Sequence, residues 1–266
     1  MDIIQAIVLA IVQGLTEFLP ISSSAHLLLV PVFTAWDDQG LAFDVAVHLG
    51  SLAAVILYFR REIADMWSAW WRSVIERRIQ DPDAKLAWAV ILGTIPVCVV
   101  ALLIKDLVAD AFRSPVVVAF GLIVFGILLG WADWRKHGQR TEYQMRARDV
   151  AVIAFAQALA LIPGTSRSGI TITAALFMGL NREAAARFSF LLSIPVIALA
   201  GAFETRGMIV EGVGVDWLAV TIGTVLSGLS AYLCIHYFLA FIKRIGMQPF
   251  VAYRIALGIL LLVLFW

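Results

Sequence analysis

Charged residues are scarce in this sequence. Only 15% of the 266 residues are Asp, Glu, Lys or Arg, where about 25% is usual, and 62% are hydrophobic. So few charges cannot cover the surface of a soluble protein, and so hydrophobic a chain does not stay disordered in water. The 20 Lys and Arg residues are balanced by 19 Asp and Glu residues, which leaves no basic excess for a nucleic-acid partner. An ordinary soluble enzyme, a disordered protein and a nucleic-acid-binding protein are therefore excluded.

Cysteine and an N-terminal basic segment are also lacking. The two cysteines, Cys98 and Cys234, lie apart in apolar runs and form no CxxC pair, which is typical of packing residues. The first 19 residues contain Asp2, Gln13 and Glu17 but no Lys or Arg. A signal peptide begins with basic residues, so we expect this segment to remain in the mature protein.

Long apolar runs are what the sequence has instead. A helix needs about 20 apolar residues to cross the roughly 30 Å hydrocarbon core of a bilayer. Six segments reach or approach this length: residues 43–59, 86–104, 115–132, 188–203, 217–242 and 250–266. We therefore predict an all-α polytopic membrane protein with six spans in one membrane domain, residues 1–266.

Two further pairs of apolar runs are too short to cross. The runs are residues 3–19, 24–35, 150–162 and 170–180. The first pair is interrupted by Pro20 and the second by Pro163, each beside a serine cluster. Short runs of this kind are more often re-entrant than spanning. We predict that each pair enters the membrane and returns to the same side, which gives ten helices in all.

The basic residues predict the orientation. With this layout, fifteen Lys and Arg residues fall on one side of the membrane, six of them in residues 60–85 and five in residues 135–148, and three fall on the other side. The side richer in basic residues is the cytoplasmic one. Both termini and residues 36–40 should then lie outside.

The two halves of the chain resemble each other in order. Three matches link them: residues 13–24 with 157–167, 93–94 with 223–224, and 115–120 with 249–254. We predict an inverted repeat, with repeat 1 at about 1–134 and repeat 2 at about 149–266, each holding one re-entrant pair and three spans. Such repeats place their site near the membrane midplane, where the interrupted helices meet.

Two helix starts are expected at this meeting point. Their polar residues are Ser22, Ser23, Ser24, Ser166, Arg167 and Ser168. Serine is a favoured N-cap, and a helix start presents free N–H groups and a partial positive charge. Together with Arg167, whose planar fork suits phosphate oxygens, the helices expected from Ala25 and Gly169 predict an anion site. Gly164 and Gly169 would let the backbone approach the ligand.

Three ionisable side chains lie at the predicted depth: Glu17, His26 and Arg167. Charge is costly there, so a functional role is the first hypothesis. Gln13 shares a helix face with Glu17, and Ser23 lies three residues before His26, a spacing that suits a nucleophile and its base. The alternative is that the serines only cap helices and that Glu17 only pairs with Arg167.

Other ionisable residues in the spans are expected to have no catalytic role. We interpret His48 and His236 as packing or interhelical hydrogen-bonding residues. Arg254 should lie near the cytoplasmic end of the last span and extend its charge to the surface.

Two motifs resemble those of a known family. Residues Gln13 to His26 are similar to (E/Q)xxxE followed by a serine-rich loop and a histidine, and Pro163 to Thr171 are similar to PGxSRSxxT. Both are signatures of the undecaprenyl-diphosphate phosphatase family, also called bacitracin resistance proteins, and the similarity extends through residues 249–254. The resemblance implies hydrolysis of a C55 polyprenyl diphosphate in the bacterial inner membrane, which recycles the lipid carrier for peptidoglycan precursors.

The resemblance also implies roles for single residues. Glu17 would be the acidic residue and the candidate metal ligand, Ser23 and His26 the reactive pair, and Arg167 the phosphate clamp, with Mg²⁺ or Ca²⁺ as cofactor. Gln13 stands where the family pattern permits Glu or Gln, so this motif cannot supply a two-carboxylate metal site. The other substrate-binding residues expected are Gln13, Ser22, Ser24, Gly164, Ser166, Ser168 and Thr171. The partners would be the lipid substrate and the bilayer, and a homodimer stays open beside a monomer.

These expectations combine into one mechanism and two rivals. Ser23 attacks the terminal phosphorus while His26, oriented by Glu17, takes the proton; in a variant, His26 is the nucleophile. A transporter could use the same repeats, helix ends and Arg167, with less need for the other three residues. An anion channel would need a polar pore, and the spans contain few polar residues. The site would be reached from the outer, periplasmic side.

Overall fold

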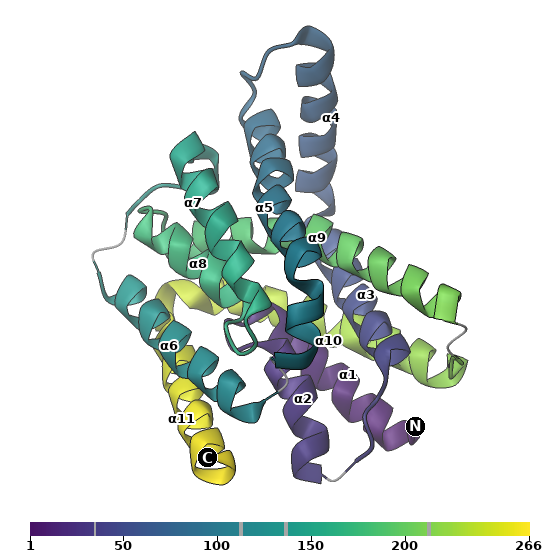
Figure 1. Cartoon of the computed structure of the whole chain (residues 1–266). Coiled ribbons are helices and arrows are strands. Elements are labelled where there is room, and N and C mark those ends of the chain that lie inside the picture. The colour runs from purple at the N-terminus through teal and green to yellow at the C-terminus, as the bar shows by residue number, and fades with distance from the viewer. Residues whose placement is uncertain (35, 112–113, 136–137, 212–213) are drawn as a thin grey trace.

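The computed structural model describes residues 1–266 except 35, 112–113, 136–137 and 212–213. Ala35, which ends a predicted apolar run, and Lys136, in a predicted basic loop, therefore lie outside the described residues. The described part contains eleven α-helices and no β-strand (Figure 1). They are α1 (Ile3–Phe18), α2 (Ser23–Thr34), α3 (Leu41–Tyr58), α4 (Arg60–Glu76), α5 (Pro82–Ala111), α6 (Pro115–Trp134), α7 (Ala147–Ala158), α8 (Arg167–Phe177), α9 (Arg182–Glu211), α10 (Trp217–Ile245) and α11 (Gln248–Phe265). Short 3₁₀ helices, η1 (Glu142–Gln144) and η2 (Leu159–Leu161), precede and follow α7.

Six helices are long and apolar enough to cross a membrane: α3, α5, α6, α9, α10 and α11. They correspond to the six predicted apolar segments, so the prediction of a multi-pass all-α membrane protein is confirmed. The helix that extends furthest beyond its predicted segment is α9, which begins at Arg182 although the predicted segment began at residue 188. The first turns of α9 contain polar residues, so they were not part of the apolar run from which the segment was predicted.

The prediction of ten helices was wrong by one, because α4 was missed. Its residues were expected to form a cytoplasmic loop, since charged side chains interrupt every apolar run there. The buried residues Met66, Ala69 and Ser73 nevertheless recur at helical spacing and form one face. Trp67 and Trp71 are exposed on the helix. Figure 1 shows α4 and the first turns of α5 extending together beyond the other helices.

Helices from the two halves of the chain pack against each other. α1 and α3 pack on α10, α6 packs on α11, and α5 packs on α7 (Figure 1). Small residues allow the closest of these approaches. A Cβ atom added to Gly50 in α3 would lie 2.2 Å from the carbonyl oxygen of Thr224 in α10, so this crossing requires glycine. The hydroxyls of Ser51 and Ser227 lie 3.0 Å apart in the same contact.

Candidate active site

The two helix interruptions meet inside the bundle. The Ser168 hydroxyl, in the first turn of α8, donates a hydrogen bond of 2.9 Å to the carbonyl oxygen of Leu19, at the end of α1. Arg167, the first residue of α8, donates to the Glu17 carboxylate at 2.9 Å. The segments around Pro20 and Pro163, separated by more than half the chain, thus contact each other as the sequence predicted.

Glu17 is the centre of this contact. Its carboxylate is 8% exposed. One oxygen, Oε1, accepts from Arg167, while Oε2 accepts from the Ser23 hydroxyl at 2.6 Å and from Gln13 Nε2 at 3.0 Å. A buried carboxylate needs several such donors to offset the loss of hydration. Four of the predicted site residues, Gln13, Glu17, Ser23 and Arg167, therefore form one connected group, which we call the Glu17 cluster.

His26 lies beside this cluster with different partners. Its Nδ1 is 2.7 Å from the carbonyl oxygen of Ser22, and its Nε2 is 2.6 Å from the Tyr253 hydroxyl. A carbonyl oxygen only accepts, so Nδ1 carries the proton of the neutral ring and Nε2 accepts from Tyr253. The His26 ring also stacks on Tyr253, with centroids 5.6 Å apart. The expectation that Glu17 orients His26 was therefore wrong in this structure: Ser22 and Tyr253 hold the ring, and Glu17 holds Ser23.

The residue before each of the two helices has an unusual backbone. Ser22 and Ser166 have φ angles of 74° and 69°, in the left-handed region that costs a non-glycine residue about 1–3 kcal/mol. Their side chains are also placed alike, because the Ser22 and Ser166 hydroxyls each lie 3.2 Å from the hydroxyl of the serine two residues later. Ser166 also caps α8 through the N–H of Gly169. Strain of this kind persists where the surrounding structure fixes it, and it is frequent at functional sites.

The predicted helix starts were two residues late. α2 begins at Ser23 rather than Ala25, and α8 begins at Arg167 rather than Gly169. Ser23 and Arg167 therefore occupy the first turns themselves, where the helix N–H groups lack acceptors within their own helix. The two helix starts expected for an anion site are present, and each carries one member of the Glu17 cluster.

The remaining predicted substrate-binding residues differ in accessibility. Ser24 is exposed, whereas Ser22, Ser166, Ser168 and Thr171 are buried. Thr171 donates within α8 and lies 2.7 Å from the Ser189 hydroxyl of α9, so its contacts in this structure support the helix.

Gly164 is needed for close packing in this structure. Its φ is 83°, and a Cβ there would lie 2.2 Å from the carbonyl oxygen of Val118 in α6. The close approach that it permits is therefore to another helix. That Gly164 and the serines contact substrate stays a prediction.

The expectation that Arg254 extends its charge to the surface was wrong. Its side chain is fully buried and donates to five carbonyl oxygens, listed here with their distances: Thr165 2.8 Å, Gly164 2.9 Å, Pro20 3.0 Å, Leu122 3.2 Å and Gly121 3.3 Å. Helix interruptions leave carbonyl groups without partners, and a guanidinium group with five N–H donors satisfies them. Arg254 thus joins both interruptions to α6. An arginine inside an apolar span was itself a signal of such a role.

His48 was expected to be a packing or interhelical hydrogen-bonding residue, and it makes an interhelical contact at the edge of the cluster. Its Nε2 is 3.8 Å from Oε2 of Glu17, and its Nδ1 is 2.7 Å from the carbonyl oxygen of Asp44. Its side chain is 33% exposed. The sequence offered no signal for this contact, because it depends on how α3 packs against α1.

In this membrane protein two interrupted helices face each other, and a carboxylate, a hydroxyl and an arginine lie at their contact. Such a site is suited to bind and react with a phosphate-like anion. The family model of the bacitracin resistance protein BacA matches residues 6–260, and the chain belongs to this family. It is 58% identical to undecaprenyl-diphosphatase 2 of Stutzerimonas stutzeri (strain A1501), over all of this chain and 99% of the relative. It is also 58% identical to the undecaprenyl-diphosphatase of Thioalkalivibrio sulfidiphilus and 56% identical to that of Nitrosococcus oceani, each over the full length of both chains. The predicted family resemblance is confirmed.

Proposed function

We propose that this chain is an integral-membrane phosphatase that hydrolyses undecaprenyl diphosphate to undecaprenyl phosphate and phosphate, in the bacterial inner membrane. The reaction recycles the lipid carrier for peptidoglycan synthesis and gives bacitracin resistance. The observation that carries the proposal is the Glu17 cluster, in which one buried carboxylate holds a serine hydroxyl and an arginine at two helix starts. The names of relatives 56–58% identical over the full chain supply the substrate.

The cluster supports a first step at Ser23. The Ser23 oxygen attacks the terminal phosphorus, its proton passes to Glu17 across the 2.6 Å hydrogen bond, and the bond from phosphorus to the bridging oxygen breaks. Undecaprenyl phosphate leaves, and the phosphoryl group stays on Ser23. A base within hydrogen-bond reach of the nucleophile is what such a step requires. This assignment gives Glu17 the role that the sequence had suggested for His26.

The second step uses His26, which lies one helix turn beyond Ser23. A water molecule attacks the phosphoserine and gives its proton to Nε2 of His26, while the Ser23 oxygen leaves and recovers the proton held by Glu17. In the alternative mechanism, His26 itself is the nucleophile. The Tyr253 hydroxyl faces Nε2 at 2.6 Å and would have to move in either mechanism.

Arg167 is proposed to hold the terminal phosphate. One nitrogen of its guanidinium group donates to Glu17 and another to the carbonyl oxygen of Ser189 at 3.1 Å, so the group is oriented before substrate binds. Donors oriented in advance stabilise the charge that develops in phosphoryl transfer. The first-turn N–H groups of α2 and α8 would add to this positive environment.

A divalent cation, Mg²⁺ or Ca²⁺, is proposed as cofactor. Among the described residues no group of three or more His, Cys, Asp or Glu could hold a metal by itself. However, the side-chain oxygen of Gln13 is buried without a hydrogen-bond partner, next to Glu17. The Gln13 oxygen and the Glu17 carboxylate would hold the ion together with oxygens of the diphosphate, an arrangement common for Mg²⁺. The ion would neutralise phosphate charge. EDTA should then suppress phosphate release, and Gln13→Glu should lower the Mg²⁺ concentration that restores it.

The finer architecture is part of the proposal. We propose two inverted repeats, about 1–134 and 149–266, with α1–α2 and α7–α8 as re-entrant pairs. The matched φ angles and hydroxyl pairs at Ser22 and Ser166 support it. So do the lengths of α2, α7 and α8, which have 12, 12 and 11 residues and are too short to cross about 30 Å. We propose further that both termini and the site entrance face outward.

A trapped phosphoenzyme tests the proposal. The purified protein is mixed with undecaprenyl diphosphate that carries a labelled terminal phosphate, and the reaction is quenched. The protein is then digested and its peptides are sequenced by mass spectrometry. We expect phosphoserine at Ser23, and Ser23→Ala should lose the label. Ser68→Ala, at an exposed position of α4 away from the cluster, is the control that should keep it. Phosphohistidine at His26 would replace the first step by the alternative mechanism. A transporter would carry no covalent label on either residue, and that result combined with tight lipid binding would overturn the proposed function.

A further inference from the structure

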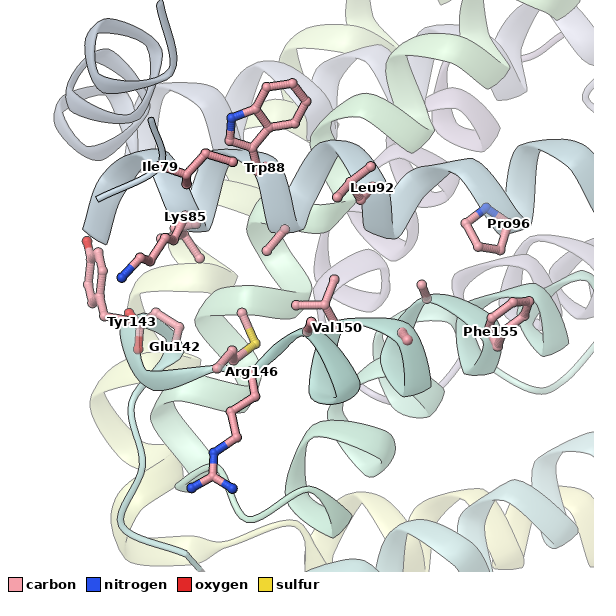
Figure 2. A pocket seen from close by; sticks show the side chains of 16 residues that line it. Ile79, Lys85, Trp88, Leu92, Pro96, Glu142, Tyr143, Arg146, Val150 and Phe155 are labelled. Atoms are coloured by element: carbon pink, nitrogen blue, oxygen red, sulfur yellow. The ribbon is translucent and has the colours of Figure 1, made fainter. Parts of the chain in front are cut away.

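A groove separate from the Glu17 cluster runs between α5 and α7 (Figure 2). Its volume is about 440 Å³. None of its lining residues belongs to the Glu17 cluster. The walls are mostly apolar and include Leu92 and Pro96 from α5 and Val150 and Phe155 from α7. Side chains of this kind accommodate a hydrocarbon chain.

The groove has one polar end. Lys85, Glu142, Tyr143 and Arg146 line this end, and the Arg146 side chain extends away from α5, whereas Pro96 and Phe155 lie at the opposite end (Figure 2). Such a gradient from charged to apolar matches the gradient along a membrane lipid.

The charged residues that line the polar end are Lys85, Arg146 and Glu142, which together carry a charge of +1. Lys85 and Arg146 are exposed and form no ion pair with any residue that the structure describes. Glu142 pairs with Arg187, whose Nε lies 2.6 Å from the carboxylate, and Arg187 also pairs with Glu62 at 2.9 Å. Two unpaired cations at the mouth therefore favour an anionic headgroup.

The length of the groove matches one leaflet of a bilayer. Lys85 and Pro96 are eleven residues apart on α5, which corresponds to about 16 Å along a helix, or about half of the roughly 30 Å hydrocarbon core. The candidate span of α5 begins at Pro82, so Lys85 lies at the level expected for headgroups. Trp88, a residue type enriched at the membrane interface, lines the same end and donates to the Ser73 hydroxyl of α4.

We propose that this groove binds one phospholipid with an anionic headgroup, taken from the leaflet at the Pro82 end of α5. An acyl chain lies between α5 and α7 as far as Pro96 and Phe155, and Lys85 and Arg146 engage the phosphate. A C55 prenyl chain is much longer than the groove, which favours a phospholipid over the substrate. The bound lipid braces α7, which leads through η2 into the segment before Arg167, so it supports the position of the clamp.

Photochemical crosslinking tests this site. The full-length protein in neutral detergent is illuminated with a phosphatidylglycerol that carries a diazirine midway along one acyl chain, and the labelled peptides are mapped by mass spectrometry. We expect labels to concentrate on residues 89–96 and 150–155. A phosphatidylcholine probe with the same chain should label these segments much less.

Charge and shape variants complete the test. Each interfacial cation strengthens binding of an anionic lipid, and the double variant Lys85→Gln/Arg146→Gln removes two of them. This variant should need about 30-fold more probe for equal labelling. The control Arg60→Gln/Arg61→Gln removes two exposed cations that do not line the groove and should leave labelling unchanged. Ala151→Trp should fill the groove and remove the chain labels while Lys85 and Arg146 remain. Labels spread evenly over the helices, equal labelling by phosphatidylcholine, or loss of label on adding undecaprenyl phosphate would each overturn the proposal.

Discussion

Glu17 serves as acceptor for three different donors, and its charge is what the arrangement of Ser23 and Arg167 depends on. The substitution Glu17→Gln preserves size but removes the charge and the proton acceptor. We predict that phosphate release falls by about 10²–10⁴, the contribution typical of a general base. Glu183→Gln, which removes a carboxylate paired with Lys243 away from the cluster, is the matched control. Activity of Glu17→Gln within a few-fold of the unmodified protein would remove Glu17 from the reaction.

Arg167 offers two donors in a planar fork, whereas a lysine offers a single point charge. Arg167→Lys should therefore lose about 10²–10³ in rate, as expected when an oriented donor is removed. The double variant Arg167→Ala/Glu17→Gln separates two explanations, because it removes both members of the ion pair. We predict that it folds, by size-exclusion profile and thermal unfolding, but releases no phosphate. Substantial hydrolysis by the double variant would mean that Arg167 only balances the charge of Glu17.

Arg254 acts on structure rather than on the phosphate. Arg254→Met would remove the donor to the Pro20, Gly164 and Thr165 carbonyl oxygens, which lie outside the helices, and a single buried unsatisfied group already costs about 1–3 kcal/mol. We predict a clear fall in unfolding temperature in detergent, and a smaller fall for Arg254→Lys, which keeps three donors. Arg244→Met, at an exposed position near the end of α10, should unfold like the unmodified protein. Equal unfolding temperatures for all variants would contradict this role.

At the scale of helices, apolar length was a sufficient signal for the six spans, because a bilayer imposes a minimum length that few other contexts require. The same search missed α4, whose buried face is amphipathic and whose charges interrupt every run. The helix interruptions were found from Pro20 and Pro163, but the exact starts depended on backbone angles at Ser22 and Ser166 that no spacing rule provides. The contact of His26 with Tyr253 and the contacts of Arg254 could not be predicted either, since they depend on where α11 packs.

The crossing of α3 and α10 gives a prediction at this scale. Gly50→Ala would place a Cβ 2.2 Å from the Thr224 carbonyl oxygen and force the helices apart. We expect a loss of about 1–3 kcal/mol in unfolding free energy, as for other overpacked cores. Gly207→Ala in α9 meets nothing within 4 Å and should leave stability unchanged. Thermal unfolding of the two variants in the same detergent makes the comparison, and equal losses would contradict the contact.

The orientation of the whole molecule is tested by cysteine labelling. In a background that carries Cys98→Ala and Cys234→Ala, a cysteine at Gln39 should react with a membrane-impermeant thiol reagent in intact cells from which the outer membrane has been made permeable. A cysteine at Gln80 should react only after lysis. The prediction rests on the excess of basic residues in residues 60–85, because the side of the membrane richer in basic residues is the cytoplasmic one. The reverse pattern would invert the topology and the side from which the site is entered.

Hydrolysis of a lipid diphosphate at the Glu17 cluster is what distinguishes an enzyme from a transporter here, since the same architecture could serve transport. Phosphate release from undecaprenyl diphosphate by the purified protein in detergent decides this most directly, because no membrane is present for transport to cross. We predict one phosphate and one undecaprenyl phosphate for each substrate consumed, with release lost in Ser23→Ala and retained in Ser68→Ala. Binding of the intact lipid without release of phosphate, in the presence of Mg²⁺ or Ca²⁺, would contradict the account.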